Sequence, residues 1–414
     1  MSRTQPSPQW QLGTWALHGG DDPELHPYHA HLPAIIPTST YAFPDVATGA
    51  AIFSGEKPGY VYGRVGHPNA DHLARKIALL EAYDFLRQGV APEEAAAGLV
   101  FASGMAAITA ALLARAKRGS VILAQKVVYG TTFVFLSQVA PQLGVQVTFV
   151  DDNTPEGWEA AFRRHAKVAW AYIETPANPT LDITDIAAVT EIAHRHNAWV
   201  AIDNTFATPY CQRPLSLGVD VVVHSTTKYI SGHGQAIGGA VVSRDLDFIH
   251  GPVHDMLKTF GGIMGPFEAW MTMMGLKTFE IRMARHCENA GRIARFLAQH
   301  PKVARVFYPG LESFPGHAVA KKQMHCFGGM ISFELKGGYE AGVRLMESLT
   351  LPALAVSLGK VDSVIEHPAS MTHRKVPAEA QRRMGITEGL VRFSVGIEPV
   401  DDLLADLERA LDQI

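Results

Sequence analysis

The sequence predicts an α/β fold in which helices cover a mostly parallel central sheet and a smaller C-terminal α+β domain follows. Apolar runs of strand length alternate with helical stretches from about residue 66. The middle runs, AWAYIE, AWVAID and VDVVVH, are nearly continuous in apolar or β-branched residues, which is typical of strands buried on both faces. Near residue 270 this alternation gives way to a long helical stretch followed by shorter helix and strand patterns.

The expected elements follow in chain order. Residues 1–60 are rich in Pro, Gly, His and Tyr and lack periodicity, which predicts an extended arm that packs on another domain or subunit. Apolar residues recur at helical spacing across Asp185–Arg195, which predicts a helix between two strands. The predicted strands are Leu99–Ala102, Ser120–Ala124, Val145–Val150, Ala169–Glu174, Trp199–Asp203, Val219–His224 and Ala236–Ser243.

These patterns divide the chain into three parts. We expect an N-terminal arm over residues 1–65, a large α/β domain over residues 66–275 and a C-terminal α+β domain over residues 276–414. The C-terminal part is predicted to hold an antiparallel sheet with helices on one face.

The composition argues against several classes of protein. Hydrophobic residues make up 47% of the 414 residues and charged residues 18%, which favours a large buried core over disorder. The formal net charge of −4 indicates no basic surface for a nucleic acid or an anionic membrane. The three cysteines, Cys211, Cys287 and Cys326, form no C-x-x-C pair, so neither a disulfide framework nor a zinc ribbon is expected. A reducing cytoplasm is the natural setting for such a chain.

No membrane span and no signal peptide are predicted. The N-terminal sequence is polar and has no apolar core of the kind that a signal peptide needs. Residues 95–114 carry no charge and meet the length rule for a span. Ser103-Gly104 interrupts this run, as in a strand, a turn and a helix, so we interpret it as part of the α/β domain.

No metal site is predicted either. The nineteen histidines are scattered and the H-E-x-x-H pattern is absent. His194 and His196 are two residues apart on a predicted helix, a spacing that does not place them on one face. The glycines near residue 235 miss the dinucleotide-binding spacing, because Ile237 occupies the place of the third glycine.

A stronger set of residues lies at predicted strand ends. Asp203 ends one strand, and Lys228 follows the next strand after Ser225, Thr226 and Thr227. In an open parallel sheet, ligands bind beyond the carboxyl ends of the strands, so these side chains are expected at one edge. Farther upstream, a strand breaks at Ser103-Gly104 and a helix begins, whose free N–H groups suit a phosphate.

A phosphate site, a carboxylate and an amine at one edge are what pyridoxal 5′-phosphate (PLP) needs. The lysine can bind its aldehyde, and an aspartate that faces the pyridine nitrogen keeps that nitrogen protonated. Each residue also has a structural reading. Asp203 suits a helix cap, Lys228 a solvated loop and Ser103-Gly104 an ordinary strand-to-helix turn. The set in this order favours the cofactor, but it does not by itself specify a reaction.

Longer stretches then resemble a known family. They are Tyr62–Arg64 (YGR), Ala102–Met105 (ASGM), Tyr129–Thr132 (YGTT), Tyr172–Pro179 (YIETPANP), Ala201–Thr205 (AIDNT), His224–Tyr229 (HSTTKY), Ser357–Gly359 (SLG), Glu366–His373 (EHPASMTH) and Val391–Glu398 (VRFSVGIE). In order from about residue 35 to the C-terminus, the chain resembles the Cys/Met-metabolism PLP enzymes. That family includes cystathionine γ-synthase, cystathionine γ-lyase, methionine γ-lyase and the O-acylhomoserine sulfhydrylases.

The resemblance implies a fold, an assembly and a role for each site residue. The implied fold is the PLP-dependent transferase fold type I (aspartate-aminotransferase-like), in a homotetramer of two tight dimers that share their active sites. Lys228 is implied to bind PLP, Asp203 to pair with the pyridine nitrogen, and Tyr129 to stack on the ring and act as acid and base. The implied cofactor contacts are Tyr62 and Arg64 from the neighbouring subunit, with Ser103, Gly104, Met105, Tyr129, Glu174, Asn178, Asp203, Ser225, Thr227 and Lys228. The implied substrate contacts are Asn178, Ser357, Thr372 and Arg392.

A few positions separate members of the family. Val356 stands where the cystathionine enzymes carry a glutamate, which favours a short or uncharged sulfur side chain. Ser357-Leu358-Gly359 differs from the sulfhydrylase pattern. Three departures count against a plain methionine γ-lyase: Thr131 in place of a cysteine, Leu257-Lys258 in place of a Lys-Asp pair, and an extra segment near residues 87–97, expected to be a surface loop.

The resulting hypothesis is a PLP-dependent γ-elimination on methionine or homocysteine that gives 2-oxobutyrate, ammonia and a thiol. Two alternatives stay open, namely γ-replacement on an O-acylhomoserine, as in cystathionine γ-synthase, and cystathionine γ-lyase activity. A non-catalytic protein on a decayed enzyme fold would have lost Lys228 or its partners, and Lys228, Asp203, Tyr129 and Arg392 are all present.

Overall fold

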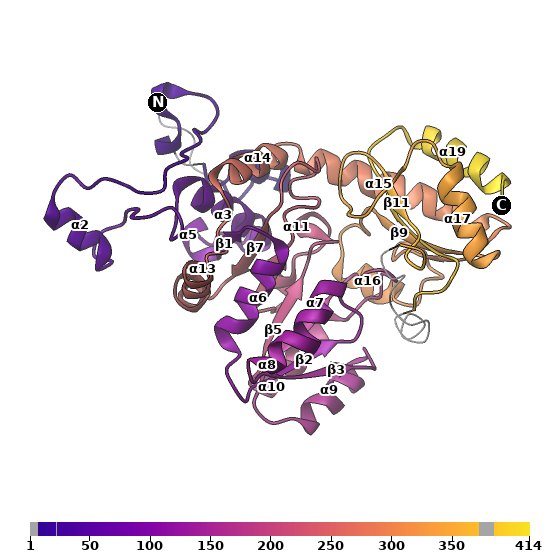
Figure 1. Cartoon of the computed structure of the whole chain (residues 1–414), viewed down its shortest axis with the longest axis horizontal. Coiled ribbons are helices and arrows are strands. Elements are labelled where there is room, and N and C mark those ends of the chain that lie inside the picture. Colours follow the sequence, from indigo (N-terminus) through magenta and orange to yellow (C-terminus); the bar gives the residue numbers. More distant parts are fainter. Residues whose placement is uncertain (1–6, 22, 372–384) are drawn as a thin grey trace.

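A seven-stranded sheet forms the centre of the large domain in the computed structural model, which describes residues 7–21, 23–371 and 385–414 (Figure 1). Its strand order is β1-β7-β6-β5-β4-β2-β3, and only β7 runs against its neighbours. The strands are β1 (Ala97–Phe101), β2 (Val121–Gln125), β3 (Gln146–Val150), β4 (Val168–Glu174), β5 (Trp199–Asp203), β6 (Val221–His224) and β7 (Gly239–Ser243). The predicted α/β class with a mostly parallel sheet is confirmed.

The start of β7 is the largest difference from the predicted strands. We expected the strand from Ala236, and it begins at Gly239. The preceding residue, Gly238, instead donates its N–H to Thr227 Oγ1 at 3.0 Å, and Thr227 Oγ1 in turn donates to Gly238 O at 3.2 Å. These bonds hold the segment before β7 against the loop that carries Lys228, so a local strand pattern yields to a tertiary contact.

Both faces of the sheet are buried, and β4 shows how. All of its residues are buried. Trp170 and Tyr172 pack into the apolar cluster on one face, whereas Ala171 and Ile173 pack into the cluster on the other. Trp170 also donates its indole N–H to Leu112 O at 2.9 Å, so its one polar group is satisfied. This alternation explains the continuous apolar run in the sequence.

Helices and short turns connect the strands. Those of the large domain are α3 (Pro68–Glu81), α4 (Tyr83–Arg87), α5 (Pro92–Ala95), α6 (Gly104–Arg115), α7 (Gly130–Val134), η3 (Phe135–Val139), α8 (Ala140–Gln142), α9 (Pro155–Arg164), α10 (Ile186–Arg195), α11 (Thr208–Cys211), η4 (Pro214–Leu217), α12 (Leu246–Phe248), η5 (Ile249–Val253), α13 (His254–Phe260) and α14 (Pro266–Leu276). Asp185 caps α10 by accepting a hydrogen bond from the N–H of Ala188. The segment near residues 87–97 contains α5, so it is not wholly a loop as expected.

The long helical stretch near residue 270 is two helices. After α14, the chain turns and continues as α15 (Phe279–Gln299). Gly275 O accepts hydrogen bonds from Thr278 Oγ1 at 3.2 Å and from Arg282 Nη2 at 2.9 Å, and these side chains satisfy the carbonyl where the first helix ends. Helix α15 then runs from the large domain toward the C-terminal sheet (Figure 1).

The C-terminal part has its own sheet and core. The sheet order is β10-β11-β12-β9-β8, and β10–β11 is its one parallel pair. The elements are β8 (Val303–Phe307), α16 (His317–Gln323), β9 (Met330–Leu335), α17 (Gly338–Ser348), β10 (Ala353–Leu354), β11 (Val364–Glu366), β12 (Leu390–Ser394) and α19 (Val400–Asp412). One apolar cluster joins this sheet to α17, α19 and the second half of α15, whose first half packs into the core of the large domain.

The first helix of the N-terminal arm packs onto the large domain, where Leu12, Trp15 and Ala16 enter its apolar core, and residues farther along the arm extend away from the body (Figure 1). The arm contains α1 (Leu12–His18), η1 (Pro23–Leu25), η2 (Pro27–His29) and α2 (Val46–Phe53). Helix α2 lies far from the sheet and exposes 90% of Val46 and 73% of Phe53. Residues 95–114, which met the length rule for a span, comprise parts of α5, β1 and α6. Among the described residues, no helix is long and apolar enough to cross a membrane.

We predict that Asp406→Asn destabilises the fold by about 1–3 kcal/mol near pH 7, because the buried carboxylate accepts several hydrogen bonds. Asp406 accepts from Thr350 N–H, Thr350 Oγ1 and Leu351 N–H, at 2.7 to 3.3 Å, and from Arg409. Burial raises the pKa of Asp406, but these bonds outweigh it and lower the pKa to about 2. The midpoint of urea unfolding, measured from pH 2 to 7, tests the prediction.

The direction with pH follows from linkage. A lowered pKa in the folded state stabilises the protein above the unfolded value, near 4, and this contribution disappears as the pH falls toward 2. The stability gap between wild type and variant should therefore close over that window. Glu408→Gln, which changes an exposed carboxylate on the same helix, should leave the midpoint nearly unchanged. A gap that persists at pH 2 would contradict the assignment.

Candidate active site

Three adjacent parallel strands bring the predicted residues to one edge of the sheet. Glu174 ends β4 and lies in register with Asp203 at the end of β5. Asp203 is paired in turn with Val223 of β6, so the loop that follows β6 leaves from the same edge. Lys228 is in that loop. The register therefore brings Asp203 and the loop of Lys228 to one edge, as the strand-end argument predicted, and it adds Glu174, which that argument did not include.

The amine of Lys228 is partly buried and directed at the C-terminal domain. Its Nζ donates a hydrogen bond to Ser357 Oγ at 2.7 Å. Burial, together with the charge of Arg392, lowers the pKa of Lys228 to about 8, against the opposing effects of Asp203 and Glu366. The lysine is therefore partly uncharged near neutral pH, and an uncharged amine is the form that attacks a carbonyl group.

Asp203 and Glu174 form a buried pair of acids. Glu174 accepts hydrogen bonds from the N–H groups of Tyr129 at 2.7 Å and Asn178 at 3.1 Å. Burial and the neighbouring Asp203 raise the pKa of Glu174 to about 8. Burial also raises the pKa of Asp203, whose Oδ1 accepts from the Thr205 N–H at 2.9 Å. Two acids that share one buried edge are stabilised by a cationic group placed beside them.

The turn between β1 and α6 comes close to the lysine loop. Ser103 Oγ accepts a hydrogen bond from the Ala106 N–H at 3.1 Å, so this side chain caps the helix. A Cβ on Gly104 would lie 2.9 Å from Ser225 Cβ, so a side chain does not fit at this position without a shift. The first N–H groups of α6 have no acceptor within the helix, and Gly104, at its start, lies against Ser225. This is a cradle of the kind that binds a phosphate.

Arg392 forms the wall opposite the sheet edge. It extends from β12, and its Nη1 donates to Asn178 Oδ1 at 3.0 Å while its Nη2 donates to Ser357 O at 3.0 Å. Its Nε lies 3.1 Å from Glu366 Oε1, in an ion pair whose side chains are 9% and 2% exposed. Glu366 lies within one of the family stretches, but the sequence analysis assigned it no role. Only the register between β11 and β12 places it opposite Arg392.

Ser357 joins the two basic residues. Its hydroxyl accepts from Lys228 and its carbonyl accepts from Arg392. Its backbone lies in the left-handed region, with φ of 82°, which is unfavourable for a residue with a side chain. Such strain persists only where surrounding contacts impose it, and it is common at functional sites. In this conformation Ser357 contacts both the amine and the guanidinium.

The remaining predicted residues divide into several groups. Tyr129 is 46% exposed beside the acid pair. The Thr227 hydroxyl forms hydrogen bonds with the backbone of Gly238. Tyr62 and Arg64 contact each other, with 5.7 Å from the guanidinium carbon to the ring, and Arg64 bonds to Lys258 O in α13. Within the described residues, neither Tyr62 nor Arg64 contacts Lys228 of its own chain. Thr372 lies outside the described residues.

The residues present fit PLP. Asp203 is a buried acid beside a second acid, an arrangement that suits the protonated pyridine nitrogen. The cradle of Gly104, Met105 and Ser225 suits the phosphate, and Lys228 carries an amine with a lowered pKa for the aldehyde. The fit rests on this set of donors and acceptors. No group of three or more histidines, cysteines, aspartates or glutamates within the described ranges is arranged to hold a metal ion.

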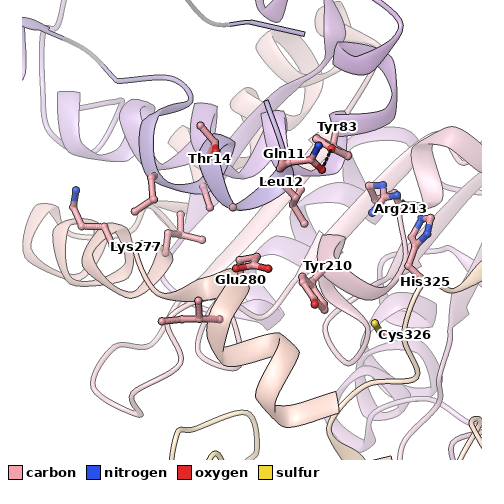
Figure 2. Close-up of a pocket in the computed structure, with 15 residues that line it drawn as sticks. Gln11, Leu12, Thr14, Tyr83, Tyr210, Arg213, Lys277, Glu280, His325 and Cys326 are labelled. Carbon is pink, nitrogen blue, oxygen red and sulfur yellow. Dashed lines mark hydrogen bonds between the residues drawn. The ribbon is translucent and has the colours of Figure 1, made fainter. Parts of the chain in front are cut away.

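A separate cavity of about 540 Å³ lies between α1 and the junction of α14 and α15 (Figure 2). Its lining includes Tyr210, Arg213, Glu280 and Cys326, and none of the fifteen residues drawn belongs to the sheet edge described above. Beneath it the cysteines converge, although the sequence spreads them widely. Cys211 Sγ and Cys287 Sγ are 3.6 Å apart as free thiols.

Known proteins resemble this chain along nearly its whole length. The profile of the Cys/Met metabolism PLP-dependent enzymes matches residues 13–412. L-methionine gamma-lyase from Fusobacterium nucleatum subsp. nucleatum is 47% identical over 409 residues, which cover 97% of this chain and 98% of that protein. Cystathionine gamma-lyase from Bacillus subtilis is 40% identical over 401 residues, covering 97% of this chain and 99% of that protein. The crystal structure of metB from Corynebacterium glutamicum has a TM-score of 0.88 at 39% identity, covering 98% of this chain and 99% of that chain.

We predict that Lys228 captures PLP, at a rate that follows its own ionisation. With a pKa of about 8, roughly a tenth of the amine is uncharged at pH 7, against roughly 1 in 3,000 for an ordinary lysine. The rate of PLP uptake by the apoprotein should rise with pH up to about 8 and then level off, since the uncharged form reacts. Stopped-flow absorbance measures this rate. Borohydride reduction and peptide mapping should label Lys228 in wild type and leave Lys228→Arg unlabelled. A label on another lysine would refute the assignment.

Proposed function

The chain belongs to the Cys/Met metabolism family of PLP-dependent enzymes, and from this premise we propose that it catalyses γ-elimination on a methionine- or homocysteine-type amino acid. The products are 2-oxobutyrate, ammonia and a thiol, after the addition of one water. The observation that carries the proposal is the meeting of Lys228 and Arg392 at Ser357, where one residue contacts the reacting amine and the carboxylate-binding group. L-methionine gamma-lyases are also among the relatives, at 44 to 47% identity.

Each group of the site has one task in this reaction. Arg392 and Asn178 bind the substrate α-carboxylate and so place Cα beside Lys228. Lys228 Nζ removes the proton from Cα, passes that proton on to the bound cofactor and, uncharged again, removes a proton from Cβ. PLP, held by Lys228, Asp203 and the Gly104 cradle, would supply the electron sink for the electron pairs that these proton removals leave on the substrate, which would allow the γ-thiolate to depart. The Tyr129 hydroxyl donates a proton to the departing sulfur. The carboxylate of Asp203 would pair with the pyridine nitrogen of PLP and keep it protonated.

The proposed substrate follows from the residue before Ser357. Val356 is an apolar side chain, 54% exposed, where an acid would attract the distal amino group of cystathionine. The thioether of methionine and the thiol of homocysteine carry no distal amino group, so neither substrate needs an acid at this position. This supports methionine or homocysteine as the substrate class.

The same proposal includes an assembly. Tyr62 and Arg64 are assigned to the phosphate site of a neighbouring subunit, in a homotetramer of two tight dimers. The arm that carries them leaves the body of its own chain, and α2 exposes apolar side chains such as Val46 and Phe53 that a second subunit would cover. The cytoplasm is the proposed compartment, since free thiols 3.6 Å apart are best kept reduced there.

A second candidate function is γ-replacement on an O-acylhomoserine. The crystal structure of cystathionine gamma synthase from Xanthomonas oryzae pv. oryzae in complex with aminoacrylate and cysteine supports it, with a TM-score of 0.88 at 37% identity over 98% of both chains. The proton transfers assigned to Lys228 serve both reactions. They differ in whether water or a second amino acid completes the turnover. Cystathionine γ-lyase activity is the third variant of the same chemistry.

We predict that purified enzyme releases 2-oxobutyrate and a thiol from L-methionine or L-homocysteine. The keto acid is measured with a coupled dehydrogenase and the thiol with a chromogenic disulfide. Incubation of O-acetyl- or O-succinylhomoserine with cysteine, followed by chromatography for cystathionine, tests the replacement reaction. Elimination from cystathionine alone would favour the cystathionine γ-lyase alternative, and no keto acid from any of these substrates would refute the lyase assignment.

We predict that Tyr129→Phe lowers kcat by roughly 10²–10⁴-fold, because the departing sulfur loses its proton donor. The backbone N–H of residue 129 still donates to Glu174 in the variant, so the acid pair should keep its geometry. PLP content and substrate affinity should therefore change little. A better leaving group, such as an activated homoserine ester, should recover part of the lost rate. An unchanged kcat with methionine would exclude the hydroxyl as the donor.

A further inference from the structure

Glu366 is a buried acid to which the proposed reaction gives no task. It ends β11 and is 2% exposed. Its Oε1 pairs with Arg392 Nε at 3.1 Å. Its Oε2 is also buried, and it accepts no hydrogen bond from any residue that the structure describes. A buried carboxylate oxygen without a donor is costly, so the position of Glu366 calls for an explanation.

Arg392 has limited capacity to bind a further carboxylate. A guanidinium carries five N–H donors. One points to Asn178, one to Ser357 O and one to Glu366, which leaves two for a ligand. A substrate carboxylate on these two donors would share a single positive charge with Glu366. Two anions around one buried cation repel each other, and little water is present to screen them.

We infer that Glu366 is a specificity-determining residue, a resident counter-anion that weakens the binding of carboxylate-bearing ligands to Arg392. In the ligand-free enzyme, it stabilises a guanidinium that would otherwise be buried without a counter-charge. It thereby limits the affinity for simple carboxylates. A larger share of the substrate binding energy then comes from the amine and the sulfur-containing side chain. This inference rests on the proposed function for its choice of ligands.

Among the residues that the structure describes, few charged groups face Glu366. Arg392 approaches it from β12, and Lys228 approaches from the loop after β6. Its other strand neighbour, β10, presents only Ala353 and Leu354. Burial raises the pKa of Glu366 against the effect of these two cations. A proton on Glu366 would release Arg392, so the affinity for a carboxylate should increase as the pH falls.

The test compares two fragments of methionine on the PLP-loaded enzyme by calorimetry. The carboxylate fragment is 4-(methylthio)butanoate, which lacks the amine, and the amine fragment is 3-(methylthio)propylamine, which lacks the carboxylate. Glu366→Gln keeps an oxygen for Arg392 and removes the charge. The variant should bind the carboxylate fragment about tenfold more tightly, about 1.4 kcal/mol, and the amine fragment within about twofold of wild type. Its thermal midpoint without ligand should fall.

The controls separate this effect from a nonspecific effect of mutation on the C-terminal sheet and from failure of the proposed reaction. Glu334→Gln removes a carboxylate from β9 of the same sheet and should leave both dissociation constants unchanged. If Glu366→Gln does not fold, Glu366→Met keeps the volume and removes the charge. Unchanged or weaker binding of the carboxylate fragment, or an equal gain for both fragments, would overturn the inference. Release of 2-oxobutyrate by wild type tests the proposed function separately, because neither fragment is turned over by elimination.

Discussion

The site depends on the burial of several ionisable groups at one edge of a parallel sheet. Lys228, Asp203, Glu174 and Arg392 would all be solvated in an unfolded chain, and the fold places them in a region of low dielectric. Desolvation makes each charge expensive and each pairing strong. It lowers the pKa of the lysine and raises that of the glutamate, each to about 8. The reactivity of the amine is thus a consequence of where the strands end.

The C-terminal domain completes the edge rather than merely covering it. Arg392 of β12 and the strained Ser357 contact Asn178 and Lys228 of the large domain through hydrogen bonds of 2.7 to 3.0 Å. Helix α15 packs its first half into one core and its second half into the other, and so fixes the relative position of the two domains. A guanidinium and an amine from different domains therefore meet at one residue, as the proposed proton transfers require.

Most of the fold could be read from hydrophobic periodicity. The strands β4 and β5 occur almost where continuous apolar runs predicted them, because burial on both faces leaves little freedom of sequence. The failures occur where a distant residue decides. The predicted strand at Ala236 starts late because Gly238 bonds to Thr227, and one predicted helical stretch is divided where Arg282 and Thr278 bind the carbonyl of Gly275. Local patterns contain no information about such partners.

Sequence alone determined which side chains could carry PLP chemistry, since Asp203 ends one predicted strand, Lys228 follows the next, and both lie within family stretches. Only the tertiary structure decided how their charges are compensated. It set Glu366 opposite Arg392, brought Cys211 to 3.6 Å from Cys287 and directed the Ser103 hydroxyl to cap a helix. The physical reason is that strand ends are a property of the local pattern, whereas ion pairs and pKa values depend on distances and burial that arise when separate segments pack together.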